Sequence, residues 1–254
     1  MLNAIVGGKA GRTNKTVEKN TPWRDVFSHK EDLLTASVFE RLSYLDASKF
    51  WSILEKTYKF KENENTEIRL LDIKFWPRWY DSKKSINYTE PDMFLVFSQG
   101  HGKGKTALIV ETKRHDNNAQ SAAQWVAQIN AFQNQLSQGN FSEIEIDELY
   151  YLAIGGLGSY GQDFIKVRDE VKACLSEADG LHVSFFGSSW LHLTNTIKKV
   201  SRNTHLTHEQ NILNDILKAL NLAGYREVVD LKTIVKTNTE THSQSLLALK
   251  WTKT

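Results

Sequence analysis

Hydrophobic positions recur at helical spacing in the first part of the chain and at strand spacing after it. The apolar positions of the first pattern are Leu33, Leu34, Val38, Leu42 and Leu45. They predict an amphipathic helix, and Ser28 followed three residues later by Glu31 has the form of a capping box that opens it. A second helix is predicted over residues 47–58, and the alternating segment 67–75 predicts a strand.

The rest of the chain alternates between strands and helices after a break at residues 76–81, which contain Pro77. Further strands are predicted over residues 92–97, 106–113, 149–154 and 182–186. Further helices are predicted over residues 119–136, 162–175, 190–200 and 209–222. This order, ααβββαβαβαα, predicts an α/β fold in which helices flank a mixed central sheet on both sides.

Composition narrows the class of protein. The apolar fraction of 40% in 254 residues is enough to bury a core without disulfides, and Cys174 is the only cysteine, which excludes a disulfide framework and a Cys-rich zinc module. No apolar run approaches the ~20 residues of a membrane-spanning helix, and the N-terminus lacks the apolar stretch of a signal peptide. We therefore expect a cytoplasmic protein with no membrane contact.

Charge is balanced overall but uneven locally. The net charge is +2, yet residues 1–30 carry six basic and two acidic side chains. We expect residues 1–22 to be a flexible basic segment, either a solvated tail or an arm that contacts phosphates. We expect a core over residues 23–187 and a helical extension packed on it over residues 188–254; whether these last helices complete the core or form a dimer stays open.

One predicted hairpin carries candidate chemistry. Strand side chains alternate, so Glu111 and Lys113 lie on the same face of the strand 106–113. The glycine-rich segment 98–105 is typical of a hairpin loop. If the hairpin is centred between His101 and Gly102, Asp92 lies directly opposite Glu111. Carboxylates so placed repel each other, and a hard cation such as Mg²⁺ would relieve the repulsion.

These residues resemble a known family. Pro91-Asp92 and Glu111-Thr112-Lys113 look like the motif of PD-(D/E)xK nucleases, the restriction-endonuclease-like superfamily. The predicted order of elements over residues 28–187 also resembles the αβββαβ core of that superfamily. The resemblance therefore implies a restriction-endonuclease-like core over residues 23–187, with additional C-terminal helices.

The resemblance also implies an activity. It implies an enzyme that hydrolyses phosphodiester bonds of DNA with Mg²⁺ or Mn²⁺, in prokaryotic restriction, phage defence or mobile-element processing. The implied metal ligands are Asp92, Glu111, Thr112 and Glu31, the implied catalytic lysine is Lys113, and the implied supports are Glu31 and Gln124, with Gln128 one turn further. A capping box alone would also explain Glu31.

Other readings of the same sequence stay open. A non-catalytic module that binds nucleic acid or protein and keeps the nuclease fold is the alternative, and a homodimer or a partner subunit remains undecided. The segment Gly156–Gly161 matches a dinucleotide-binding fingerprint, but the next strand lacks the closing acid, which favours a tight strand-to-helix turn. The segment Gly102–Thr106 lacks the Walker spacing, and His205 and His208 have no cysteine partner for a zinc site.

An aromatic and basic segment precedes the hairpin. Residues 75–80 contain four aromatic side chains, and Lys83 and Lys84 follow. Aromatic rings interleaved with bases are typical of grooves that bind nucleic acid without sequence preference. Packing of Trp76 and Trp79 in the core is the competing interpretation.

Overall fold

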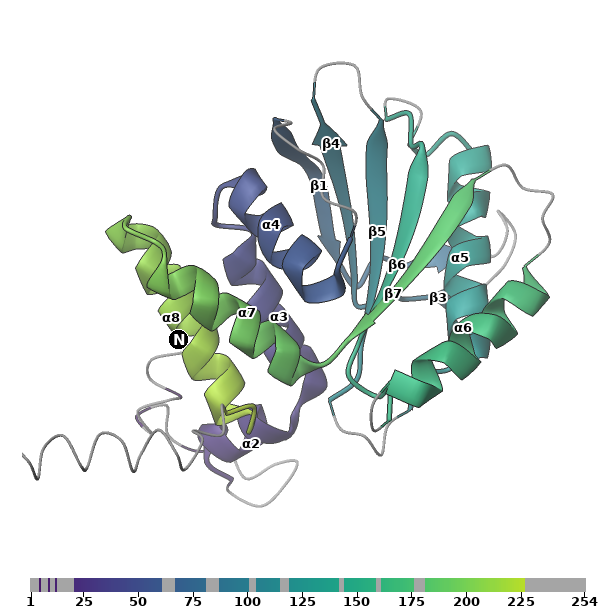
Figure 1. The fold of residues 1–254 in the computed structure, drawn as a ribbon. Helices are drawn as coiled ribbons and strands as arrows, with labels where there is room; N and C mark the ends of the chain where they lie inside the picture. The colour runs from purple at the N-terminus through teal and green to yellow at the C-terminus, as the bar shows by residue number, and fades with distance from the viewer. Residues whose placement is uncertain are drawn as a thin grey trace, which may run out of the picture.

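The computed structural model shows an α/β fold with a five-stranded mixed sheet between two helical layers (Figure 1). The fold class expected from the sequence is confirmed at this level. The structure describes residues 5, 9, 12, 21–60, 67–80, 87–100, 104–114, 119–141, 144–158, 161–175 and 181–226. Most of the predicted basic segment 1–22 and all of residues 227–254 therefore lie outside the described residues.

The central sheet has the order β1-β4-β5-β6-β7. Its strands are β1 (Ile68–Phe75), β4 (Met93–Gln99), β5 (Lys105–Thr112), β6 (Glu148–Ile154) and β7 (His182–Ser188). The first three are antiparallel, and β5, β6 and β7 are parallel. Five strands were predicted close to these positions. A separate two-stranded sheet, β2 (Trp79–Tyr80) with β3 (Tyr88–Thr89), was not predicted.

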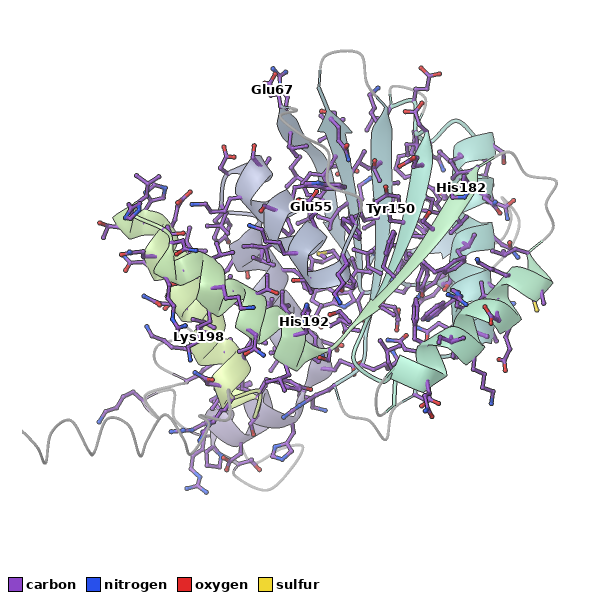
Figure 2. All side chains as sticks on the ribbon, in the orientation of Figure 1. Glu55, Glu67, Tyr150, His182, His192 and Lys198 are labelled. Carbon is purple, nitrogen blue, oxygen red and sulfur yellow. The ribbon has the colours of Figure 1, made fainter. Side chains whose placement is uncertain are left out.

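Helices cover both faces of the sheet (Figure 1). The helices are α2 (Trp23–His29), α3 (Glu31–Leu42), α4 (Ala47–Tyr58), α5 (Ala122–Ser137), α6 (Gln162–Cys174), α7 (Trp190–Arg202) and α8 (Thr207–Leu222). One apolar core joins the sheet to α3, α4, α7 and α8, and a second joins it to α5 and α6. Side chains fill both interfaces (Figure 2). Tyr150, labelled there, lies on the α4 side, with its ring 5.1 Å from that of Phe60.

The C-terminal helices are part of the first core. Side chains of α7 and α8, including Trp190, Ile197 and Leu220, are buried in the same cluster as Leu34 and Val38 of α3. Helix α8 packs directly against α3. Residues 190–222 therefore complete the core of the domain. Within the described residues, no helix is long and apolar enough to cross a membrane.

The predicted register of the hairpin is confirmed. Met93 pairs with Val110 and Phe94 with Ile109, as expected for a turn centred between residues 101 and 102. The same register places Asp92, just before β4, across from Glu111. Side-chain alternation helps to fix this register, because a slip of one residue would turn every buried side chain of the slipped strand to the opposite face.

The predicted capping box is wrong. Ser28 lies in α2, and its hydroxyl donates to the Asp25 carbonyl oxygen at 2.9 Å. Helix α3 begins at Glu31 with Lys30 as N-cap and no side-chain cap hydrogen bond. The motif was misassigned because a short helix, α2, occupies the position at which the sequence pattern placed the cap. Glu31 is thereby free of a capping role.

Two further expectations need correction. The long helix begins at Ala122 rather than Ala119, because the Ser121 hydroxyl caps it by accepting from the Gln124 N–H. Gln120 therefore precedes the helix instead of lying on its face. The predicted break at 76–81 is confirmed for residues 76–78, which lie outside the strands. It is wrong for Trp79 and Tyr80, which form β2 and pair with β3.

The turn after β6 requires glycine at its first position. Gly155 has φ +71°, and a Cβ added to it would lie 1.9 Å from the carbonyl oxygen of Lys113. The same turn continues with positive φ at Gly156, Gly158 and Gly161, the N-cap of α6. The glycine-rich segment thus forms the tight strand-to-helix turn predicted from the sequence, and it brings β6 against the end of β5.

We predict that Gly155→Ala destabilises the protein by about 3 kcal/mol or more. The left-handed backbone costs an L-residue about 1–2 kcal/mol, and overpacking against a backbone atom adds about 1–3 kcal/mol. Gly139→Ala is the matched control, because Gly139 has φ +74° with nothing within 4 Å of the added Cβ. Urea denaturation should show only the backbone cost for this control. Equal losses in the two variants would contradict the close approach.

Candidate active site

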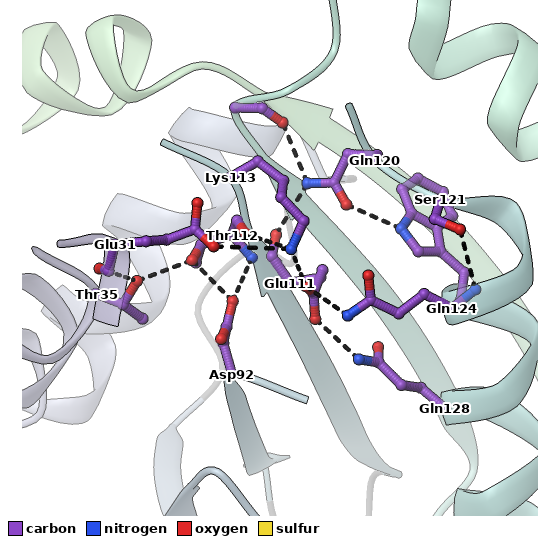
Figure 3. A network of polar contacts seen from close by, with 12 residues as sticks. Glu31, Thr35, Asp92, Glu111, Thr112, Lys113, Gln120, Ser121, Gln124 and Gln128 are labelled. Atoms are coloured by element: carbon purple, nitrogen blue, oxygen red, sulfur yellow. Dashed lines mark hydrogen bonds and ion pairs between the residues drawn. The ribbon is translucent and has the colours of Figure 1, made fainter. Parts of the chain in front are cut away.

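Asp92 is held at the start of β4 by the end of β5. Its buried carboxylate accepts two hydrogen bonds at Oδ2, from the Thr112 N–H at 2.7 Å and from the Thr112 hydroxyl at 2.8 Å (Figure 3). The Thr112 hydroxyl oxygen also lies 2.8 Å from that of Thr35 on α3. Among the described residues, no hydrogen bond reaches Oδ1 of Asp92. One oxygen of this carboxylate is therefore fixed and the other is available for a ligand.

Glu111 points toward α5, where two amides hold it. Its side chain is only 2% exposed. The Nε2 group of Gln124 donates to Oε1 at 2.8 Å, and that of Gln128 donates to Oε2 at 2.8 Å (Figure 3). The buried Tyr151 hydroxyl donates to Oε1 of Gln128 at 2.6 Å, which directs the NH₂ group of that amide toward Glu111. Gln124, the implied support, and Gln128, one turn further, thus both contact Glu111.

Lys113 follows β5 and lies between two acids. Its ammonium group donates to Oε1 of Glu111 and to the Thr112 carbonyl oxygen, the latter at 3.0 Å, and it lies 3.7 Å from Oε1 of Glu31. The Lys113 backbone is fixed on both sides, because its N–H donates to the Ile154 carbonyl and its carbonyl accepts from the Trp190 indole. These contacts place the ammonium at the same end of the β4–β5 hairpin as Asp92 and Glu111 (Figure 3).

Glu31 joins the first turn of α3 to the residue after Lys113. Its Oε2 accepts from the Arg114 N–H at 2.5 Å. The Arg114 carbonyl accepts from the Tyr225 hydroxyl, and the Arg114 guanidinium donates to the Ala223 carbonyl at 3.2 Å. The chain segment that leaves β5 is therefore bound both to α3 and to the end of α8. Glu31 occupies the site for this reason and has no part in a cap.

Burial and neighbouring charges shift the pKa values of Asp92, Glu31 and Lys113. Burial, and then the negative charge of Glu111, raise the pKa of Asp92 from its ordinary value of 3.8 to about 6, against the two Thr112 bonds that lower it. Burial likewise raises the pKa of Glu31, opposed by Lys113 and the Arg114 N–H. Burial lowers the pKa of Lys113, but the carboxylates led by Glu111 outweigh it and the net shift is upward. The ammonium is therefore charged at neutral pH.

The donor set fits a hard divalent cation. The described residues include no group of three His, Cys, Asp or Glu side chains arranged to hold a metal. Mg²⁺, however, needs only one or two carboxylates from the protein and completes its shell with water and substrate oxygens. Asp92 has one oxygen without a hydrogen bond among the described residues, and Glu111 lies across the hairpin from it. These two carboxylates repel each other and together meet that requirement. The Thr112 carbonyl oxygen faces the same ammonium and is a third oxygen donor at the site.

Several residues of the network were not found from the sequence. Thr35 and Tyr151 reach the site from elements distant in the sequence. Gln120 joins the ends of β5 and β6, because its Nε2 donates to the Glu111 carbonyl at 3.4 Å and to the Gly155 carbonyl at 3.1 Å. Its Oε1 accepts from the Trp125 indole at 3.0 Å. No local pattern marks such contacts, although the position of Gln120 just before Ser121, the helix cap, is a weak signal.

We predict that Asp92→Asn stabilises the metal-free protein at neutral pH. The folded-state pKa of Asp92 exceeds the ordinary value, so the native state binds more protons between about pH 4 and pH 6 and loses stability as the pH rises through that window. The variant avoids this loss and should unfold with a free energy higher by up to about 3 kcal/mol at pH 7.5, with little gain at pH 4. Denaturation in EDTA at both pH values measures this difference.

Asp169→Asn is the matched control, because Asp169 is exposed on α6 and its replacement removes the same charge from the surface. A pH-independent effect of Asp92→Asn, or lower stability at pH 7.5, would contradict the electrostatic account.

Comparisons with known proteins give one relative of the chain. No protein-family model matches the sequence, and no solved structure matches it significantly. The chain is 30% identical over 244 residues to the uncharacterized protein PM0110 of Pasteurella multocida (strain Pm70), a match that covers 92% of this chain and 85% of that protein. Because the match extends over nearly the whole of both sequences, the chain belongs to the same family as PM0110.

Proposed function

We propose that the protein is a metal-dependent nuclease of the PD-(D/E)xK type that hydrolyses phosphodiester bonds of DNA. The observation that carries the proposal is the convergence of Asp92, Glu111 and Lys113 at one end of the β4–β5 hairpin. The hairpin register that brings them together also follows from the sequence pattern. A buried pair of acids beside an ammonium lowers the stability of a fold. Such groups are typical of sites that bind a ligand or carry out a reaction.

The order of elements supports the same proposal. Helix α3 supplies Glu31, strand β5 supplies Glu111, and α5 supplies the two amides. Asp92 directly precedes β4 and Lys113 directly follows β5, while β1 pairs antiparallel with β4. Strand β6 then pairs in parallel with β5. This order is similar to the αβββαβ order that the resemblance implies for a restriction-endonuclease-like core, and it is followed here by β7, α7 and α8.

Each residue has a role that follows from its contacts. Asp92 and Glu111 would hold the cation, which supplies a Lewis acid that activates water and neutralises charge on the phosphate. Gln124 and Gln128 fix the orientation of the Glu111 carboxylate by donating to both of its oxygens. Lys113 places a charged ammonium where it can donate to a phosphate oxygen as negative charge develops there. Glu31 holds that ammonium at the site through its carboxylate.

A non-catalytic binding module is the second candidate. Lys113 already neutralises Glu111 through a direct ion pair, so the charges of the site are partly satisfied without a cation. A protein that keeps the fold only to bind nucleic acid would show this arrangement and no cleavage.

We predict that Asp92→Asn, Glu111→Gln and Lys113→Met each lower the rate of DNA cleavage by about 10²-fold or more. The assay incubates supercoiled, linear and single-stranded DNA with Mg²⁺ or Mn²⁺. Asp72→Asn and Lys74→Met are matched controls, because these residues form an ion pair of the same type on β1 at 3.1 Å, and they should cleave like the wild type. Wild-type protein that binds DNA and cuts none of the substrates favours the binding module; unchanged cutting in all three site variants places the activity elsewhere.

We also predict that Mg²⁺ or Mn²⁺ raises the melting temperature of the wild-type protein and not that of Glu111→Gln. The cation binds the folded site and stabilises it by mass action, whereas the neutral amide is a weak ligand. Thermal denaturation with a titration of each metal measures this without any substrate. A shift of equal size in the variant would show that the metal binds at another place.

A further inference from the structure

The β2–β3 hairpin presents two tyrosine rings to solvent. Trp79 and Tyr80 are successive residues of β2 and point to opposite faces. Trp79 is buried, with its ring 5.3 Å from that of Phe94 and 5.5 Å from that of Phe132 on α5. This burial corrects the alternative in which Trp79 was part of a stacking groove. Tyr80 and its cross-strand partner Tyr88 are instead 42% and 48% exposed.

The two rings form one surface with a cation on it. Tyr80 and Tyr88 have ring centroids 5.9 Å apart. The Arg78 guanidinium lies 5.0 Å from the centroid of the Tyr88 ring and pairs with Glu90 at 3.0 Å. We call Arg78, Tyr80 and Tyr88 the tyrosine platform. Two accessible aromatic rings beside a guanidinium are the groups that bind nucleobases by stacking and phosphates by charge.

The platform is connected to the candidate site at both of its ends. The Trp76 N–H, two residues before Arg78, donates to the Asp92 carbonyl at 3.1 Å. Thr89, the last residue of β3, precedes Asp92 by three residues, a reach of at most about 11 Å. Helix α5, which supplies Gln124 and Gln128, also packs against β2 and β3 (Figure 1). The platform is therefore on the side of the sheet toward which Glu111 points.

We propose that the tyrosine platform binds the bases of an unpaired DNA strand and leads that strand to the site at Asp92 and Glu111. The role of the platform in cleavage rests on the proposed nuclease function, whereas its binding of the strand does not. In a duplex each base stacks between its neighbours, and an exposed ring at the surface cannot reach a base face. An unpaired strand has free faces, so the platform selects single-stranded DNA, or the single-stranded end of a duplex, over continuous duplex.

The test measures binding in EDTA, where no cleavage interferes. The probes are a fluorescein-labelled twenty-nucleotide oligothymidylate and a duplex of the same length, followed by fluorescence anisotropy. We expect Tyr80→Ala and Tyr88→Ala each to weaken binding of the single strand about five-fold or more, the loss of one stacked base, and to change duplex binding less than two-fold.

Two controls separate stacking from folding. Tyr44→Ala removes another exposed tyrosine, 61% accessible, two residues beyond the far end of α3, and should bind like the wild type. Tyr80→Trp should keep single-strand binding, whereas Tyr80→Leu, which retains an apolar side chain in the hairpin, should weaken it about as much as Tyr80→Ala at an unchanged melting temperature.

Failure of this inference differs from failure of the proposed function. Loss of single-strand binding in the platform variants supports the inference, even if the wild-type protein cuts no DNA. Three results overturn it, even if the wild-type protein cuts DNA. They are a wild type that fails to bind the single strand, two variants that both bind it as tightly as the wild type, and two variants that both lose duplex binding as much as single-strand binding.

Discussion

The burial of two acids, Asp92 and Glu111, at the open end of the β4–β5 hairpin is the main constraint on this structure. Buried carboxylates that lie close together repel each other, and hydrogen-bond donors offset part of the cost of burying them. The donors around Asp92 and Glu111 are Thr112 of β5, the amides of α5 and the ammonium of Lys113. Even so, the pKa of Asp92 rises to about 6 through burial and through Glu111. The pair costs the fold stability, and a divalent cation held by the two carboxylates would offset that cost.

The elements outside the hairpin hold its end in place. The turn at Gly155 approaches the Lys113 carbonyl so closely that no side chain fits, and the indole of Trp190 donates to the same carbonyl at 3.0 Å. Beyond it, Tyr225 and Glu31 bind the backbone of Arg114. The C-terminal helices therefore both complete the apolar core and fix the position of the lysine. A site held by so many backbone contacts needs little reorganisation when a ligand binds.

Sequence patterns predicted the parts of this structure that depend on local periodicity. The hairpin register followed from alternation and the glycine-rich loop, and it placed Asp92 across from Glu111. Glu31 was predicted as a metal ligand and support with a capping box as the competing explanation, and local sequence could not decide between them because its partner, the Arg114 N–H, is 83 residues away. Thr35 and Tyr151 were missed because their partners also lie on separate elements. Gln120 was missed because its acceptors, the Glu111 and Gly155 carbonyls, are backbone atoms. The β2–β3 hairpin was missed because each of its strands has only two residues, too few to show a period.

We propose that the carboxylates of Asp92 and Glu111 hold one divalent cation between them. Anomalous diffraction from crystals soaked in Mn²⁺ would locate this cation. We expect a manganese peak in contact with an oxygen of each acid, with the Lys113 ammonium displaced from Glu111 and still within the site. Absence of a peak at full soaking concentration, with Lys113 still paired to Glu111 and Asp92 bonded to Thr112 alone, would contradict it.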